Sequence, residues 1–181
     1  MDATSYELRR ATDADLPMIE RWLAERHVAK WWGKLPKEIA EIASHIRGGD
    51  AEPYIVSHDG RPIGYLQTYR AEADADIPPQ PSGTLGVDFL IGETTALGKG
   101  HGPGMLKQLA EQCTAAGIVR LIADPDGRNV SSVGCLGRAG FSPVSLIGPI
   151  SARRLLMSRD LVPIPVERTA DRPSRRRQRA S

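Results

Sequence analysis

Cysteine is scarce in this sequence, whose 181 residues include only Cys113 and Cys135. Both lie in apolar stretches with helical periodicity, and neither belongs to a pair with the short spacing of a metal site. The four histidines show no metal-ligand spacing either. We therefore predict no metal and two reduced, buried thiols, which is the pattern of a cytoplasmic protein.

Long apolar segments are also missing. The chain begins MDATSYELRRATDADL, a polar and acidic stretch without the apolar core of a secretion signal. No apolar run approaches the roughly 18 residues of a membrane-spanning helix. We expect neither secretion nor membrane insertion, and a cytoplasmic location.

The body of the chain lacks a positive charge excess. The net charge is +2, but residues 171–181 hold five arginines and one aspartate, so the remainder carries about −2. A nucleic-acid-binding domain would show a basic stripe on its folded part, so we expect no nucleic-acid partner and instead a small cationic one. The Arg- and Ser-rich residues 166–181 have little to bury, which predicts a disordered basic tail after a single domain at residues 1–165.

Strand and helix signals alternate in a mixed order. A strand at YELRRA precedes a helix capped by Thr12 or Asp13, and a second helix is expected at 36–46. PYIVSHDGRPIGYLQTY contains two strand-like runs around Asp59-Gly60, a strong hairpin signal. TLGVDFLIG, a helix at 102–116 and VRLIAD form a strand-helix-strand unit, followed by a helix in NVSSVGCLGRAG and strands in FSPVSLIG and ARRLLMSR. The pattern predicts one α/β (α+β) domain with hairpins at both ends.

A glycine-rich turn, LGKGHGPG, joins the TLGVDFLIG strand to the following helix. A phosphate cradle needs backbone N–H groups in unusual conformations beside the positive end of a helix, and four alternating glycines before a helix meet that need. Lys99 adds a charge, and Pro103 is tolerated in the first turn. The spacing matches neither GxGxxG nor the P-loop, so composition alone leaves a plain turn as an equal alternative.

Asp88 is a lone carboxylate in the apolar strand TLGVDFLIG. Burial disfavours the charged form and should raise its pKa toward neutrality, which suits a general base that deprotonates an attacking amine. The structural alternative is a carboxylate that pairs with an arginine or caps a bulge.

The segment GVDFLIGETTALGKGHG, followed by a helix, a strand and DPDGRN…CLGRAGF, resembles the core of the GCN5-related N-acetyltransferase (GNAT) superfamily. In that superfamily a (Q/R)xxGx(G/A) turn binds the pyrophosphate of coenzyme A. Leu97 departs from the first position, and LGKGxG is similar to the aminoglycoside 6'-N-acetyltransferase branch. LRRATDADL, HVAKWWG, PYIVSHDGRPIGYLQTY, GVDFLIGE and AGF match that branch in order from Tyr6 to Arg159.

The resemblance implies a mixed, mostly antiparallel sheet flanked by helices, which splays between the TLGVDFLIG and VRLIAD strands to admit pantetheine. It implies acetyl-CoA as co-substrate and Asp88 as the catalytic, amine-binding base. A backbone N–H near Leu90 or Ile91 would face the developing oxyanion. His101 is either a phosphate ligand or a solvated turn residue, and Asn129 is an N-cap that also contacts the cofactor. The implied cofactor site comprises Leu90, Ile91, Leu97, Gly98, Lys99, Gly100, His101, Gly102 and Asn129.

Substrate contacts are expected from aromatic, amide and acidic side chains. One of Trp31 and Trp32 should form a platform for a sugar ring, the alternative being a core lid. Tyr65 and Gln67 share a strand face and should line the same cleft. Acidic residues of the loop AEADADIPPQPSG are either solvated or substrate-facing. Asp76 of that loop and Asp124 align with substrate-binding acids of the aminoglycoside branch, and together such acids would attract a polycation.

Two alternatives remain beside an aminoglycoside acetyltransferase acting as a monomer or homodimer. A siderophore-biosynthesis N-acyltransferase acting on a hydroxylysine-type amine resembles LIGE and DPDGRN, but that branch carries a histidine where Asp88 stands. A non-catalytic module that binds coenzyme A or a cation is the other. It stays open because Leu136 occupies the place of the tyrosine that often protonates the leaving thiolate in the superfamily.

Overall fold

A computed structural model describes residues 6–71 and 75–162. Seven strands and four helices were expected at the positions above, and the structure confirms their order. The strands are β1 (Tyr6–Arg10), β2 (Ala51–His58), β3 (Arg61–Arg70), β4 (Thr84–Ile91), β5 (Arg120–Ala123), β6 (Ser142–Ile147) and β7 (Arg154–Asp160). The α-helices are α1 (Leu16–Ala24), α2 (Arg26–Ala29), α3 (Leu35–Ile46), α4 (His101–Ala115) and α5 (Val130–Arg138). Single 3-10 turns lie at η1 (Asp13–Asp15), η3 (Thr94–Ala96) and η4 (Ile150–Ala152).

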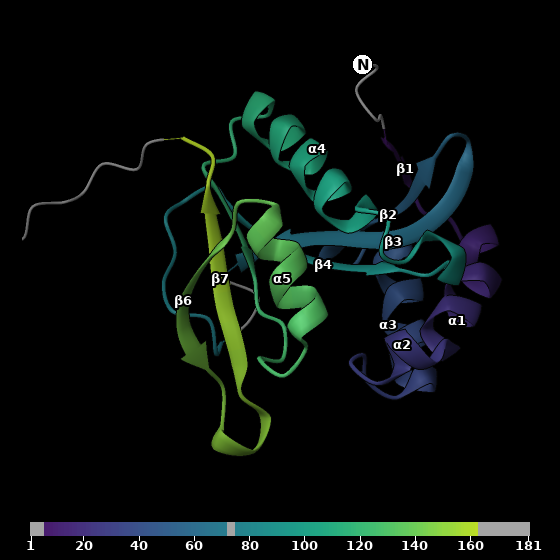
Figure 1. The fold of residues 1–181 in the computed structure, drawn as a ribbon, viewed down its shortest axis with the longest axis horizontal. Helices are drawn as coiled ribbons and strands as arrows, with labels where there is room; N and C mark the ends of the chain where they lie inside the picture. Colours follow the sequence, from purple (N-terminus) through teal and green to yellow (C-terminus); the bar gives the residue numbers. More distant parts are fainter. Residues whose placement is uncertain (1–5, 72–74, 163–181) are drawn as a thin grey trace, which may run out of the picture.

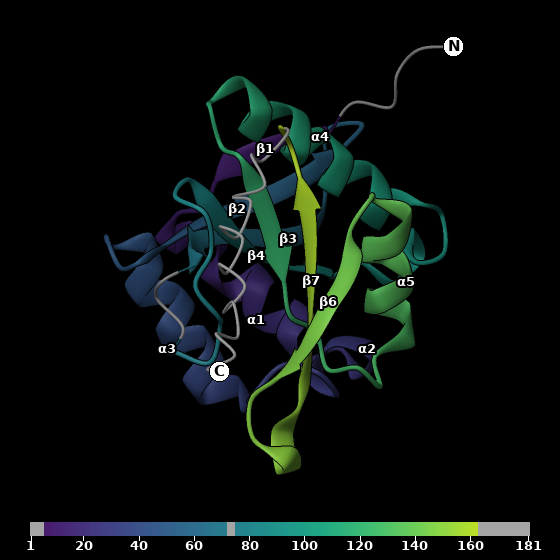
Figure 2. The ribbon, with the colours of Figure 1, turned by 90° about the vertical axis from the view of Figure 1, so that its left-hand side faces the viewer.

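The strands form one sheet in the order β1-β2-β3-β4-β5-β7-β6. Its neighbours are antiparallel apart from β4 and β5, which are parallel and pair only at Thr84–Gly86 with Arg120–Ile122. Beyond Gly86 the two strands separate, so the sheet opens into two halves (Figure 1; Figure 2 shows the β6-β7 half in front). The predicted splayed sheet is confirmed.

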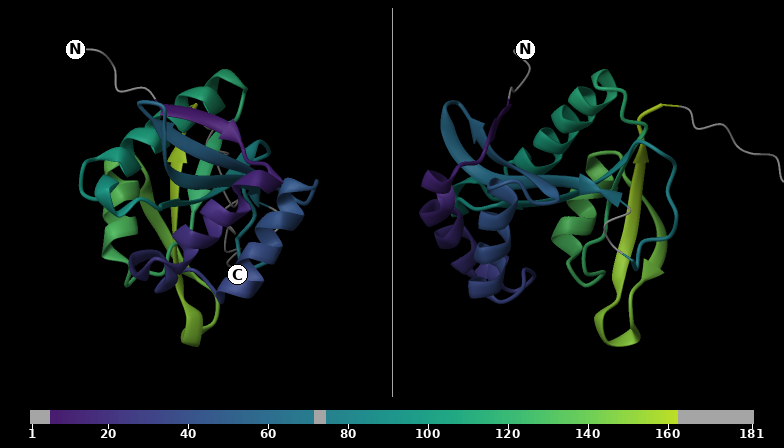
Figure 3. Two further views of the ribbon diagram at one scale, coloured as in Figure 1. Left: turned by 90° about the vertical axis from the view of Figure 1, so that its right-hand side faces the viewer. Right: turned by 180° about the vertical axis from the view of Figure 1, so that it is seen from behind.

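The alternation of side chains along the strands divides the core. Val56, Leu66 and Val87 face α4 and α5, whereas Ile55, Tyr65 and Leu90 face α1 to α3. The helices accordingly lie on opposite sides of β2 to β4 (Figure 3). Asp88 lies two residues before Leu90 in β4, so its side chain is on the same face of the strand and points toward α3.

Local sequence explains the turn and the cap that frame these elements. Asp59 and Gly60 have φ values of 51° and 71°, the left-handed conformation that a tight hairpin requires, so β2 and β3 pair directly. Asn129 accepts a hydrogen bond from the Ser132 N–H at 3.1 Å and caps α5 as predicted. No helix in the described ranges is both long and apolar enough to cross a membrane.

Candidate functional site

Two adjoining clefts occupy the opening between the sheet halves. One, the glycine-turn cleft, has a volume of about 740 Å³ and extends along β4 to the N-terminus of α4. The other, the charged cleft, has a volume of about 760 Å³ and lies between α3, β4 and the ends of β5 and β7. The clefts share a wall formed by Trp31, Trp32, Phe89, Asn129 and Ser132.

The glycine turn places backbone groups at the end of its cleft. Gly98 and Gly100 have φ values of 73° and 83°, a left-handed conformation that is costly for any other residue. Gly100 is the N-cap of α4, and the first-turn amides that follow have no acceptor within the helix. The turn therefore offers the geometry of an anion cradle.

The later glycines serve packing instead. A Cβ at Gly102 would collide with the Cys135 sulfur of α5, and a Cβ at Gly104 would overlap the Tyr6 hydroxyl of β1. The expectation that all four alternate glycines supply unusual backbone angles is thus wrong for these two, because both lie inside α4.

The predicted cofactor residues line the glycine-turn cleft with one exception. Lys99 is exposed and is not among the residues that line it. It lies between Gly98 and Gly100 within the turn, and its phosphate contact stays a prediction. The residues that do line the cleft are Leu90, Ile91, Leu97, Gly98, Gly100, His101, Gly102 and Asn129.

His101 is held by neighbours rather than solvated. Its Nδ1 lies 3.2 Å from the Tyr6 hydroxyl, and its ring centroid lies 4.4 Å from that of His58. Burial lowers the pKa of His101, and the charges of His58 and Lys99 lower it further. The lowered pKa favours the neutral imidazole, which is suited to hydrogen bonding rather than to charge pairing.

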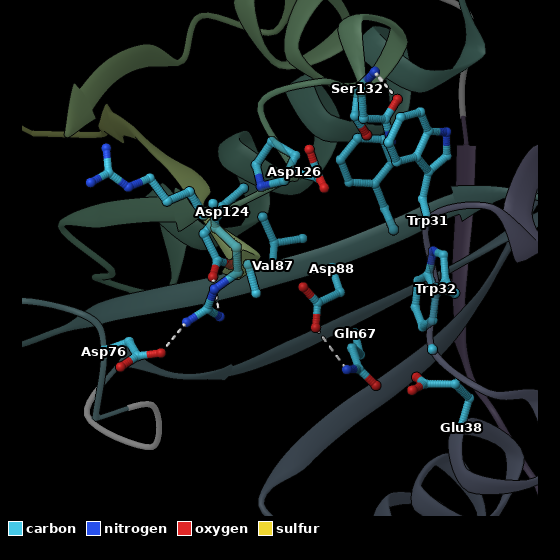
Figure 4. A pocket seen from close by; sticks show the side chains of 18 of the residues that line it. Trp31, Trp32, Glu38, Gln67, Asp76, Val87, Asp88, Asp124, Asp126 and Ser132 are labelled. Atoms are coloured by element: carbon cyan, nitrogen blue, oxygen red, sulfur yellow. Dashed lines mark hydrogen bonds and ion pairs between the residues drawn. The ribbon is translucent and has the colours of Figure 1, made fainter. Parts of the chain in front are cut away.

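Asp88 receives a hydrogen bond from the adjacent strand. Gln67 Nε2 donates to Asp88 Oδ2 at 2.9 Å, and the Tyr65 hydroxyl donates to Gln67 Oε1 at 2.7 Å. Burial raises the pKa of Asp88, as the sequence predicts, and Glu38 and Glu41 raise it further. The Gln67 bond and the charge of Arg154 act in the opposite direction. The carboxylate lies at the floor of the charged cleft (Figure 4).

Tyr65 does not line either cleft, contrary to the prediction. It is fully buried and packs edge-on against Trp32, with ring centroids 6.2 Å apart. Its role is to hold Gln67 from behind, because strand alternation places both residues on one face but the α3 side covers Tyr65. Trp31 and Trp32 both border the clefts, where a platform for a ring was expected.

Asp76 and Asp124 line the charged cleft on the side away from Trp32 and Glu38 (Figure 4). Both contact Arg154: its Nη1 lies 2.6 Å from Asp124 Oδ2 and its Nη2 lies 3.0 Å from Asp76 Oδ2. The sequence predicts the two acids but not the arginine between them. Two other acidic residues of the Asp76 loop, Glu72 and Asp74, both lie outside the described residues.

Sequence reasoning also missed Glu38 and Glu41, which line the charged cleft from α3. They are three residues apart and so share a helix face, a signal that the sequence did contain. Burial and the nearby Glu41 raise the pKa of Glu38. These acids give the Trp32 side of the cleft its negative charge.

Leu136, which stands at the position expected for a tyrosine acid, is fully buried and lines the charged cleft. Among the described residues, neither cleft is lined by any tyrosine. Cys135 borders the glycine-turn cleft, but burial raises the pKa of its thiol to about 11, which makes it a poor nucleophile. The described ranges contain no group of His, Cys, Asp and Glu arranged to hold a metal.

Known proteins share this fold. Residues 11–148 match the family described as the acetyltransferase (GNAT) domain. Aminoglycoside N(6')-acetyltransferase type 1 of Klebsiella pneumoniae is 30% identical over 148 residues, which cover 76% of this chain and 74% of that protein. The solved structure of AAC(6')-Ib with coenzyme A and kanamycin is 27% identical, has a TM-score of 0.76, and aligns over 86% of this chain and 95% of its own.

A relative with a different acceptor is also similar. The N-hydroxyputrescine acetyltransferase of Acinetobacter baumannii is 31% identical over 114 residues, which cover 59% of this chain and 54% of that protein. Its alignment is shorter than that of the aminoglycoside enzymes. Both kinds of relative are named for acetyl transfer to an amine.

Proposed function

Because the chain belongs to the GNAT acetyltransferase family, we propose that it acetylates a primary amine of a polycationic amino sugar, as an aminoglycoside 6'-N-acetyltransferase. The family uses acetyl-CoA as co-substrate, and solved relatives hold coenzyme A or acetyl-CoA. The observation that carries the proposal is the position of Asp88, which lines the charged cleft directly before Phe89, a residue of the wall shared with the glycine-turn cleft.

The glycine-turn cleft has the features that coenzyme A requires. Gly98, Gly100 and the first turn of α4 would hold the pyrophosphate, and the open edge of β4 at Leu90 and Ile91 would face the pantetheine. Asn129 borders the same path. Bound acetyl-CoA would supply an activated acetyl thioester, and these residues would hold it next to the cleft that contains Asp88.

Asp88 is the proposed base. A substrate amine arrives as an ammonium ion, and the carboxylate both binds it and accepts its proton, after which the neutral amine attacks the acetyl carbon. A raised pKa makes Asp88 a better proton acceptor at neutral pH. A backbone N–H of Leu90 or Ile91 is the proposed donor to the carbonyl oxygen as it gains charge.

The leaving thiolate does not depend on a tyrosine at position 136. An ordinary thiol has a pKa of about 8.5, so a thiolate is a tolerable leaving group near neutral pH. Leu136 therefore does not by itself argue for a non-catalytic module. We propose that the thiolate leaves unassisted or takes its proton from water.

The substrate class is proposed from the acids of the charged cleft. Glu38, Glu41 and Asp88 form a negative wall that would attract and orient a cation carrying several ammonium groups. Trp31 and Trp32 offer apolar faces beside that wall for a sugar ring. A linear hydroxylated diamine is the second candidate, because the Acinetobacter relative is named for such a substrate.

A thiol-release assay separates these functions. Purified protein with acetyl-CoA should release free thiol in the presence of kanamycin or tobramycin, and the product should carry one acetyl group at the 6' amine by mass spectrometry and NMR. Turnover with N-hydroxyputrescine or N6-hydroxylysine but not with aminoglycosides would replace the proposal by the second candidate. Binding of coenzyme A without turnover of any amine would leave a non-catalytic module.

A further inference from the structure

Arg154 lies between two aspartates of the charged cleft and joins three segments of the chain. It is the first residue of β7, whereas Asp124 directly follows β5 and Asp76 belongs to the loop between β3 and β4. Its guanidinium donates to Asp124 at 2.6 Å and to Asp76 at 3.0 Å. A cation built into the protein thus contacts the two carboxylates that would suit a substrate ammonium.

The three side chains differ in exposure. Asp124 is only 7% exposed, whereas Asp76 is 51% and Arg154 is 31% exposed. A carboxylate as buried as Asp124 requires a cationic or hydrogen-bonding partner, since an uncompensated buried charge is strongly destabilising. The exposed contact to Asp76 contributes little. Arg154 supplies the cation at Asp124, and the Tyr69 hydroxyl lies 3.5 Å from the other carboxylate oxygen. Asp124 also lines the cleft, so a ligand there can reach the same carboxylate.

Arg128 provides a contrast within the same cleft. It pairs with Asp126 only two residues away, and its side chain is 82% exposed. Both residues of that pair are close in sequence and Arg128 is exposed to solvent, so replacing Arg128 should alter the charged cleft little. Arg154, in contrast, covers a carboxylate that is otherwise buried.

We propose that Arg154 is an internal competitor for the substrate: its guanidinium occupies the Asp76–Asp124 subsite until a second ammonium of a polycationic acceptor displaces it. The inference rests on the proposed function, because it assumes an acceptor with more than one amine. The ammonium replaces the guanidinium at Asp124 and Arg154 turns toward solvent, so the buried carboxylate is never left uncompensated. Arg154 then sets the affinity for polyamines and leaves the affinity for single amines unchanged.

The first test compares Arg154→Gln with Arg120→Gln. Arg120 also joins β5 to β7 through an ion pair, at 2.6 Å to Asp160, but lines neither cleft, so its substitution controls for lost charge and lost pairing. Steady-state kinetics would use kanamycin and 6-amino-6-deoxyglucose, which carries only the reacting amine. Arg154→Gln should lower the KM for kanamycin by about three- to tenfold, with kcat within about twofold, because one competing cation is removed.

The single-amine acceptor should show no change in KM with Arg154→Gln, and Arg120→Gln should change neither acceptor. A higher KM for kanamycin in Arg154→Gln, or an equal change for both acceptors, would overturn the inference and make Arg154 a structural link between strands.

A second measurement uses the unmodified protein and does not depend on the folding of a variant. The side-chain Nε–Hε signals of Arg154 and Arg120 are followed by ¹⁵N NMR during titration with kanamycin. Displacement predicts a shift and faster solvent exchange for Arg154 alone. Saturation with kanamycin that leaves the Arg154 signal unchanged would contradict the inference.

Calorimetric binding of kanamycin distinguishes a failure of this inference from a failure of the proposed function, because it needs no turnover. Tighter binding by Arg154→Gln than by the unmodified protein, without turnover of kanamycin by either, would support the internal competitor and remove the aminoglycoside acetyltransferase function. Turnover of kanamycin by both proteins with the same KM would support the proposed function and overturn the inference that Arg154 competes with the substrate. Binding by neither would overturn both.

Discussion

Gln67 and Asp88 are cross-strand partners in β3 and β4, and the Gln67 amide donates a hydrogen bond of 2.9 Å to the Asp88 carboxylate. The bond favours the charged form of Asp88 against a burial that favours the neutral form. Gln67 thereby favours the deprotonated carboxylate that the proposed base requires, and it also lines the charged cleft.

Gln67→Leu should move the acid limb of the kcat/KM profile to higher pH. Removing a bond that lowers the pKa of Asp88 raises that pKa, and a base with a higher pKa becomes deprotonated only at higher pH. Tyr65→Phe, which removes the hydroxyl behind Gln67, should move the limb in the same direction by less. An acid limb that stays in place for Gln67→Leu would show that the profile does not report Asp88.

Asp88→Asn should reduce kcat/KM at pH 7 by about a hundredfold or more, the usual range for loss of a general base. The deficit should narrow as pH rises, because an amine that is already deprotonated needs no base. Rates measured from pH 6 to pH 10 test this. A small deficit that does not vary with pH would make Asp88 a structural residue.

The same substitution should stabilise the protein at neutral pH. The folded state raises the pKa of Asp88, so it binds the proton more tightly than the unfolded chain does, and stability falls as pH rises from the ordinary aspartate pKa through the raised one. Asparagine does not titrate, so the variant does not lose this stability as the pH rises. The Tm of Asp88→Asn should exceed that of the unmodified protein at pH 7 and approach it below the ordinary aspartate pKa, as measured by calorimetry.

Gly100→Ala should weaken binding of acetyl-CoA. Its φ of 83° costs a residue with a Cβ about 1–2 kcal/mol, so the turn relaxes and its amides leave the cradle. The expected rise in KM for acetyl-CoA is roughly tenfold, the equivalent of about 1.4 kcal/mol. Gly137→Ala is the matched control, because Gly137 lies in α5, lines neither cleft and has no atom within 4 Å of an added Cβ. Equal effects of the two changes would argue against the cradle.

The sequence identifies features that depend on neighbouring residues. The Asp59-Gly60 turn, the Asn129 cap and the glycine turn before α4 all follow from local conformational preferences, and the structure confirms their positions. The raised pKa of Asp88 is also predictable, because an apolar strand surrounds it on both sides.

Features that depend on contacts between distant segments could not be predicted from the sequence. Tyr65 shares a strand face with Gln67, but only the packing of α3 and Trp32 decides that one is covered and the other reaches the cleft. Arg154 lies 30 residues from Asp124 and 78 from Asp76, and no spacing rule connects them. Lys99 lies between the two left-handed glycines and is not among the residues that line the cleft, so its phosphate contact stays a prediction.

The wall that the two clefts share, formed by Trp31, Trp32, Phe89, Asn129 and Ser132, has a kinetic consequence. Both reactants can be held at once on either side of it, and the thiol of Cys135, whose pKa is about 11, is unsuited to carry the acetyl group between them. The acetyl group should then pass directly from donor to acceptor within a ternary complex. Double-reciprocal plots at several fixed acceptor concentrations should intersect, whereas parallel lines would require a covalent acetyl-enzyme.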